Sequence, residues 1–321
     1  MKTSIPFLKR FTYLALIAAF ILCVTGCGGG PKKIRLGINA WPGYEILYLA
    51  QVKGFFKQEG VDVELVDFNS LSDAARSYEV GQIDGLATTV VEVLMVRSNT
   101  NKNLKITRVF DYSNGADVIV TPKEIPTMQD LRGKVVGVEL ASVGTFILGR
   151  ALEISGMNFS EIKIDSEDQL TMEERLKLGE ISAVVTYPPV AIKLLENEKY
   201  HSVFTSAQIP GEVVDVLAVD GDLLVKNKKS FDAINRALDL AYDYMKLNKE
   251  EAIRIMASRE SITPEEFLAA LEDGIELTTP EESKSYISRG EKLEGVINQT
   301  AKYLENMKVI NGKPEVTDCL E

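Results

Sequence analysis

The chain has 321 residues and a formal net charge of −11, with 47 acidic side chains against 36 basic ones. This acidity argues against binding to nucleic acid or to anionic lipid surfaces, because both repel negative charge. One histidine and three cysteines are too few for a His/Cys metal cluster or a disulfide framework, and they disfavour a Ser/His or Cys/His catalytic pair. The composition therefore predicts no metal, no cofactor and no nucleic-acid partner.

The N-terminus has the parts of an export signal. Three basic residues precede the apolar run 11–23, which is followed by Val24-Thr25-Gly26-Cys27, a sequence that resembles the lipobox of bacterial lipoproteins. The run has 13 residues, fewer than the roughly 20 that a spanning helix needs. We expect residues 1–26 to be removed as a lipoprotein signal peptide, and 27–33 to be a lipidated Cys27 with a flexible linker. An ordinary cleaved signal with an incidental cysteine is the alternative.

Short apolar runs then alternate with segments of helical periodicity. The first series has strands at 34–38, 61–66, 85–88 and 106–110, with helices at 46–56, 72–80 and 89–97. The second series has strands at 134–138, 162–164 and 183–186, with helices at 145–155 and 172–178. A strand at 213–219 precedes helices at 231–256, 264–272 and 288–307. Such alternation predicts an α/β protein with doubly wound, mostly parallel sheets.

The length predicts two lobes, because about 290 residues after the signal exceed the usual size of one core. The C-terminal helices have too few strands for a sheet of their own, so we expect them to pack on the first lobe. Lobe 1 is then 34–115 plus 214–321, and lobe 2 is 116–213. The chain crosses between the lobes twice.

Aromatic residues follow two of the predicted strands. In open α/β sheets a ligand lies beyond the carboxyl ends of the strands. Trp41, the only tryptophan, and Tyr44 flank a Pro-Gly turn there, and each ring would contribute about 0.5 to 2 kcal/mol over a bound cation. Tyr187, before two prolines, offers a ring from the second lobe. The alternatives are that Trp41 caps the core and that the segment around Tyr187 is only a stiff connector.

Hydroxyl groups mark several predicted helix starts. Ser142 and Thr145 open the helix at 145–155, where free backbone N–H groups form a seat for a carboxylate or sulfonate. Thr88 and Thr89 repeat this pattern, and Ser70 before the helix at 72–80 is assigned to the same ligand-binding set. Plain N-caps without a ligand are the alternative.

Acidic residues gather at the strand ends and the crossings, where the loops carry no Lys or Arg. We assign Asp111, Asp117, Glu212 and Asp215 to ligand binding; Glu139 shares this position. Carboxylates accept hydrogen bonds, so they favour a ligand with an amine or several N–H and O–H donors over nitrate or sulfate. The alternative is that single carboxylates cap helices or hold the hinge.

Several short motifs occur in a recognisable order. They are Trp41-Pro42-Gly43-Tyr44, Gly54-Phe55-Phe56 before Gly60-Val61, Gly81-Gln82-Ile83-Asp84, the 111–117 segment, Leu131-Arg132-Gly133-Lys134 and Tyr187-Pro188-Pro189. With them the chain resembles the nitrate-, sulfonate- and taurine-type substrate-binding proteins of ABC importers, a superfamily that includes binders of thiamine-pyrimidine precursors.

This resemblance implies a two-lobed periplasmic-binding-protein-like fold of type II, with the ligand cleft between lobes that close on a solute. By position, Trp41 and Tyr44 match the aromatic loop of the first lobe, and Tyr187 matches an aromatic residue of the second. Ser142 and Thr145 match the polar helix start, although many relatives have a different spacing there. The 111–117 run matches a crossing segment of some members.

Together these features predict a monomeric, extracytoplasmic lipoprotein that binds and does not catalyse. Its partners are a small organic nitrogen or sulfur compound and an ABC permease in the membrane. Two alternatives remain: a ligand-sensing module for a membrane signalling receptor, and a same-fold enzyme such as a pyrimidine synthase or a dehydratase.

Overall fold

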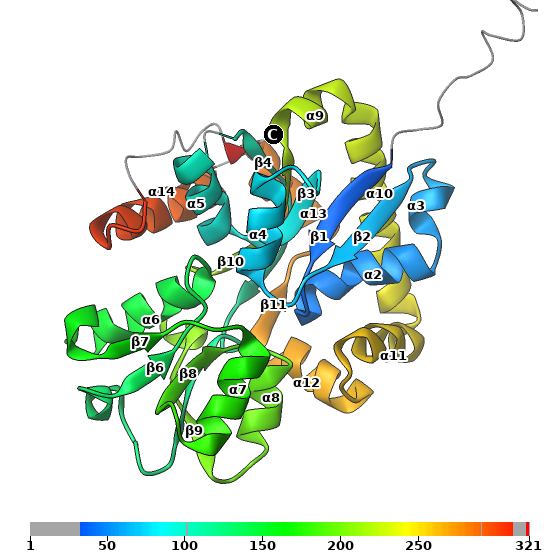
Figure 1. Cartoon of the computed structure of the whole chain (residues 1–321). Coiled ribbons are helices and arrows are strands. Elements are labelled where there is room, and N and C mark those ends of the chain that lie inside the picture. The colour runs from blue at the N-terminus through cyan, green and yellow to red at the C-terminus, as the bar shows by residue number, and fades with distance from the viewer. Residues whose placement is uncertain (1–32, 101, 290, 311–318, 321) are drawn as a thin grey trace, which may run out of the picture. The chain divides into compact units, whose positions relative to one another are not determined.

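Two β-sheets flanked by helices organise the chain (Figure 1). The computed structural model describes residues 33–100, 102–289, 291–310 and 319–320. The predicted signal peptide and lipidated cysteine lie outside the described residues. No helix within these ranges combines the length and the apolarity that crossing a bilayer requires.

The larger sheet has the strand order β11-β4-β10-β3-β1-β2. Its strands are β1 (Ile34–Ile38), β2 (Val63–Asp67), β3 (Gly85–Thr89), β4 (Leu104–Ser113), β10 (Val214–Asp220) and β11 (Ile275–Leu277). β1 is parallel to β2 and β3, whereas β10 is antiparallel to β3 and β4. The chain leaves this sheet at the end of β4 and re-enters at the same edge, so β10 has to run in the opposite direction.

The smaller sheet has the order β7-β6-β8-β5-β9. Its strands are β5 (Val118–Pro122), β6 (Val135–Gly137), β7 (Lys163–Asp165), β8 (Ala183–Thr186) and β9 (Tyr200–Thr205). β6 is parallel to β7 and β8, and β5 is antiparallel to β8 and β9. Both sheets are thus mixed, and the expectation of mostly parallel sheets is wrong. Strands that enter from a crossing reverse direction, which strand–helix alternation alone does not reveal.

Helices cover the larger sheet. They are α2 (Glu45–Val52), α3 (Phe55–Gln58), α4 (Leu71–Glu79), α5 (Val90–Thr100), α9 (Gly221–Lys226), α10 (Lys228–Leu247), α11 (Lys249–Glu260), α12 (Pro264–Gly274), α13 (Pro280–Arg289) and α14 (Glu291–Asn306). α4 and α5 pack on β3, α2 packs on α10, and α14 packs on α5 (Figure 1). Fully buried apolar side chains, such as Leu36 and Leu86, form the core between these layers.

The smaller sheet carries α6 (Val143–Ile154), α7 (Gln169–Leu178) and α8 (Val190–Leu195). The described residues also form short 3-10 helices in the loops of both sheets: η1 (Pro42–Tyr44), η2 (Met128–Leu131), η3 (Phe159–Glu161) and η4 (Ser206–Gln208). The expected helix at 231–256 is interrupted at Asn248, whose backbone is not helical (φ −131°, ψ 50°). The predicted helix at 288–307 corresponds to α14 and reaches only the last two residues of α13, so most of α13 was not predicted. β5, β9, β11 and α8 were not predicted, because each is short and lacks a clear period.

One end of the strands in each sheet positions the functional residues. On the larger sheet, Asp215 is in register with Thr89 on β3 and with Asp111 on β4. The loop that carries Trp41 follows β1 at this same end. On the smaller sheet, Tyr187 directly follows β8, and Asp117 directly precedes β5.

Candidate functional site

A small cavity lies where the strand ends of the larger sheet face those of the smaller sheet. Its lining residues come from both sheets: Asn39, Trp41, Tyr44, Leu71, Thr89, Asp117, Val143, Tyr187 and Asp215. The free volume is about 10 Å³, which is near the space that one water molecule needs. An organic solute therefore enters only when the two sets of strand ends separate or the lining side chains turn.

Aromatic rings from both sheets close this cavity. The Trp41 and Tyr187 rings meet edge to face, with centroids 6.0 Å apart and an interplanar angle of 76°. The Tyr44 ring lies 6.3 Å from that of Trp41 and is fully buried. Such edge-to-face pairs stabilise an arrangement beyond the area they bury. The contact between Trp41 and Tyr187 therefore links the loop after β1 to the loop after β8.

Asp111 fixes the aromatic loop through hydrogen bonds to Trp41. The Trp41 indole Nε1 donates to both Asp111 carboxylate oxygens, each at 3.3 Å. A Cβ atom on Gly43 would lie 1.8 Å from Asp111 Oδ2, so only glycine fits at this point of the turn. The Pro-Gly turn thus lets the carboxylate approach the backbone between the two rings.

Asp215 contributes the second carboxylate at these strand ends. One of its oxygens accepts a hydrogen bond from the Tyr44 hydroxyl. Its other oxygen, Oδ2, is buried and accepts no hydrogen bond from an N–H or hydroxyl group of the described residues, while the carboxyl group of Asp111 lies beside Asp215. Burial, together with the negative charge of Asp111, raises the pKa of Asp215 well above its ordinary value. When a ligand donor or cation favours the ionised form of Asp215, this oxygen can accept a hydrogen bond from it.

Acceptors outnumber donors around the cavity. Asn39 Oδ1 is also buried without a partner among the described residues, and Asp117 lines the same space. No Lys, Arg or His is among the described residues that line the cavity. Burial raises the pKa of Asp111 to about 7 and that of Asp117 to about 6. Buried acceptors without donors are costly, so this cavity is suited to a solute that brings N–H or O–H groups.

The polar helix start takes a different role from the one predicted for it. Ser142 caps α6: its Oγ accepts from Gly144 N at 3.1 Å and donates to the Glu139 carbonyl oxygen at 2.8 Å. The Thr145 hydroxyl donates to the same carbonyl at 3.4 Å. Neither side chain lines the cavity, whereas their neighbour Val143 does. The geometry is that of the alternative interpretation, an N-cap.

The hydroxyl and N–H groups that were predicted to bind an anion donate instead to Glu92, a residue that the sequence analysis did not single out. Glu92 Oε2 accepts from Thr88 Oγ1 (3.2 Å), Thr89 Oγ1 (2.5 Å) and Thr89 N (3.0 Å). Its Oε1 accepts from Val143 N at 2.5 Å, at the start of α6. Glu92 is fully buried, and burial raises its pKa to about 7. The signal that would have found it is the Thr-x-x-Glu capping box from Thr89 to Glu92.

A second carboxylate makes the reciprocal contact. Glu139, which follows β6 of the smaller sheet, accepts from Ser72 N in the first turn of α4 at 2.7 Å. Its Oε2 is buried without a partner among the described residues. Each sheet thus sends one glutamate to a helix start that belongs to the other, and these contacts join the two sets of strand ends around the cavity.

Besides Ser142 and Thr145, four predicted residues are not among those that line the cavity: Asp111 and Thr88, which bond to Trp41 and Glu92, and also Ser70 and Glu212. Ser70 caps α4 by accepting from Asp73 N at 3.1 Å. Glu212 forms a two-pronged ion pair with Arg150 of α6, at 2.8 and 3.0 Å. Neither Ser70 nor Glu212 lines the cavity, and the Glu212 carboxylate is already neutralised by Arg150.

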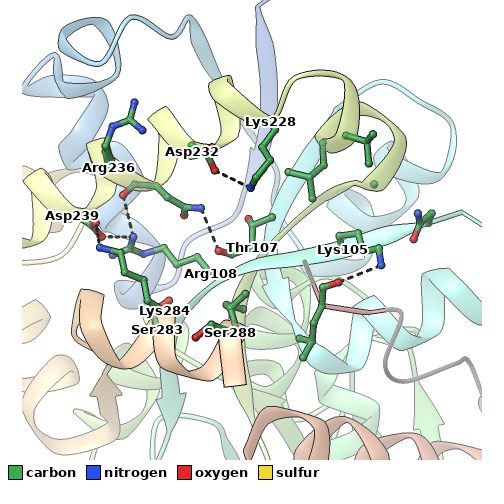
Figure 2. A pocket seen from close by; sticks show the side chains of 17 residues that line it. Lys105, Thr107, Arg108, Lys228, Asp232, Arg236, Asp239, Ser283, Lys284 and Ser288 are labelled. Carbon is green, nitrogen blue, oxygen red and sulfur yellow. Dashed lines mark hydrogen bonds and ion pairs between the residues drawn. The ribbon is translucent and has the colours of Figure 1, made fainter. Parts of the chain in front are cut away.

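A larger pocket lies at the other end of the strands of the larger sheet. Its volume is about 810 Å³, and Lys105 of β4 and Gly221 after β10 are among the residues that line it. Its charges are paired: Lys228 with Asp232 at 3.2 Å, and Arg108 with Asp239 at 2.8 Å (Figure 2). No residue of the smaller sheet lines this pocket in the described part of the chain. We therefore place the candidate site at the acceptor-lined cavity, where both sheets contribute.

The buried carboxyl groups predict an inverted pH dependence of stability. Glu92 has a raised pKa in the folded state, so the folded chain retains a proton that the unfolded chain releases. The resulting stability is present below a pH of about 4.5 and is lost as the pH rises through about 7. We expect the free energy of unfolding to fall by on the order of 2 to 3 kcal/mol from pH 5 to pH 8 in urea titrations.

The matched variant for this measurement is Glu92→Gln, which keeps one of the two acceptor oxygens but cannot titrate. It should show a shallower decline than the native chain over the same range. A free energy of unfolding that rises from pH 5 to pH 8, with the same slope in both proteins, would contradict the assignment.

Comparisons with known proteins place this geometry in context. The family model described as "NMT1/THI5 like" matches residues 41–252. A candidate binding protein of Brucella abortus (strain 2308) is 21% identical over 286 residues, covering 85% of this chain and 86% of the relative. A candidate thiamine biosynthesis protein of Haemophilus influenzae is 23% identical over 255 residues, covering 77% of this chain and 79% of the relative.

A solved structure shows the fold. The alkanesulfonate-binding protein from Xanthomonas axonopodis pv. citri, bound to MOPS, superposes with a TM-score of 0.75 at 14% identity, covering 92% of this chain and 99% of that chain. This similarity confirms the predicted two-lobed periplasmic-binding-protein fold.

Proposed function

Since the chain belongs to the NMT1/THI5-like family, we propose that it is the solute-binding protein of an ABC importer. It works as a monomer outside the cell membrane, held there by a lipid on Cys27. Lobe 1 (34–115 plus 214–321) and lobe 2 (116–213) close on a small organic nitrogen compound and present it to the permease. The predicted site residues that line the cavity are its ligand contacts.

The observation that supports this proposal is the pairing of aromatic faces with unpaired acceptors. Trp41 comes from lobe 1 and Tyr187 from lobe 2, so a solute between them is enclosed only when the lobes close. Asp215 Oδ2 and Asn39 Oδ1 lack donors among the described residues. A flat or cationic group with several N–H donors satisfies both features, because rings bind π faces and cations while buried oxygens bind donors.

The solute class follows from this chemistry. The alkanesulfonate-binding relative takes a ligand with an anionic sulfonate, whereas the cavity here has acceptors and no cationic side chain in the described residues. Among the classes that the sequence predicts, an amine-bearing or aminopyrimidine-like compound therefore fits better than a plain sulfonate. Identification of the solute retained by the natively purified protein, by mass spectrometry, tests this choice; a retained sulfonate without any amine contradicts it.

The affinity for an amine should depend on pH in a defined direction. The pKa values of Asp111 (about 7) and Asp117 (about 6) are raised, so both groups take up protons as the pH falls to 5. Because a cation binds better to the ionised form, affinity for an amine that stays protonated should drop about tenfold or more from pH 8 to pH 5. Calorimetry at both pH values measures this. Binding of an alkanesulfonate that strengthens at pH 5 would point to an anion site instead.

The lipid anchor gives a separate prediction. Cys27→Ser removes the thiol that would carry the lipid, so the protein should move almost completely from the membrane fraction to the supernatant of disrupted cells. Cys23→Ser, within the part expected to be cleaved, is the matched control and should leave the protein on membranes. Immunoblots of the two fractions measure the result; membrane association that survives Cys27→Ser would refute the tether.

A further inference from the structure

Glu92 occupies the place where an oxyanion ligand would bind. Hydroxyl and N–H groups of Thr88 and Thr89 reach it from the larger sheet, and Val143 N reaches it from the start of α6. The next N–H group of that helix, on Gly144, is already bonded to Ser142 Oγ. The donors on which a sulfonate or nitrate would depend are therefore bonded within the chain.

We propose that Glu92 is the specificity-determining residue of this site. Its carboxyl group occupies the place of a bound oxyanion: it accepts from the donors there and so keeps anionic solutes out, and this leaves only the acceptor side of the cavity for a ligand. The inference rests on the proposed function, since it concerns the same solute site. It deepens that function by naming the residue that separates nitrogen-donor solutes from oxyanions.

The electrostatics of the described residues support this assignment. α6 has twelve residues, so the start of the helix carries a positive partial charge that favours one anion. Glu92 occupies that position, and its partners Thr89 and Val143 line the cavity together with the buried Asp117 and Asp215, without a basic side chain among the described lining residues. A second anion would meet like charges where water does not screen them. The unpartnered Asn39 Oδ1 and Asp215 Oδ2 independently indicate a ligand that donates hydrogen bonds.

Removing the Glu92 carboxyl group should create an oxyanion site. In Glu92→Ala, and in Glu92→Ser as a second variant, the donors from Thr89 and Val143 are left free. We expect methanesulfonate or nitrate, exchanged for chloride at constant ionic strength, to raise the Tm by about 5 °C once its concentration is about 100-fold above its Kd. The native protein should show no such rise. Glu92→Gln is the matched control, because its amide still fills the space and its single oxygen still accepts part of these bonds, and it should not respond either.

Each result decides the proposal. If Glu92→Ala folds only when methanesulfonate replaces chloride, that rescue supports it. An equal Tm rise in the native protein, or no oxyanion response in both Glu92→Ala and Glu92→Ser, overturns it. The assay uses only inorganic and simple organic anions, so it does not depend on finding the native solute. Failure to bind any amine would count against the proposed function, while the anion response would still decide the role of Glu92.

Discussion

Asp215→Asn should weaken the binding of an amine-bearing solute about 30-fold or more, because truncating one partner of a buried charge pair costs at least about 2 kcal/mol. Asp215 Oδ2 faces no donor in the described residues, and the carboxyl group lies in register with Asp111. A cationic amine in the cavity would favour ionisation of this carboxyl, whereas an amide cannot ionise. Calorimetry with the solute identified from the native protein, or with a primary amine of similar size, measures the change.

The same strand provides the matched control. Asp220 lies at the other end of β10, where it caps α9 by accepting from Leu223 N at 2.8 Å. Asn is also a good N-cap, so Asp220→Asn should leave affinity unchanged. A deaminated analogue should bind the native protein and Asp215→Asn equally well. Equal affinity of native protein for the amine and its deaminated analogue would show that the carboxylates do not select the ligand.

Trp41→Ala should reduce affinity at least tenfold, because it removes the lobe 1 ring that faces Tyr187. The side chain is only 4% exposed, so the free energy of unfolding should also fall by about 3 to 5 kcal/mol through the cavity that is left. Affinity by calorimetry and stability by urea titration separate the two effects. An unchanged affinity in a folded variant would reject the aromatic site.

Trp41→Phe is the control for this prediction. It keeps an aromatic ring but loses the indole N–H that bonds to Asp111 at 3.3 Å. We expect a smaller loss of stability than in Trp41→Ala and an intermediate affinity. If Phe and Ala weaken binding equally, the hydrogen bond to Asp111 matters and ring stacking does not.

The positions of the cavity residues follow from simple rules about strand ends. Tyr187 stands directly after a predicted strand, Trp41 stands in the loop after another, and Asp111 and Asp215 stand near the ends of two more. Since ligands of open α/β sheets bind beyond these ends, their approach to one another could be expected from order alone. The direction of β10 could not, because antiparallel re-entry depends on which edge the returning chain meets.

The fate of the hydroxyl groups shows the limit of sequence patterns. Thr89 and Ser142 have the residue types and helix-start positions of an anion seat, and each was open to an alternative interpretation as a cap. A capping pattern does not say whether its free donors meet a ligand or a side chain from elsewhere. In the folded chain Glu92 reaches α6 although 51 residues separate it from Val143. That contact depends on the packing of two helices from different sheets.

The sequence by itself determined the α/β alternation, the aromatic loop and the excess of acidic residues at strand ends, because these depend on local periodicity, turn residues and composition. Tertiary structure alone decided which acceptors stay unpaired, that Glu212 is neutralised by Arg150, and that Glu92 fills the helix start. Hydrogen bonding between segments distant in the sequence is set by how the two sheets meet. A carboxylate available to a ligand and one already satisfied therefore look the same until the chain is folded.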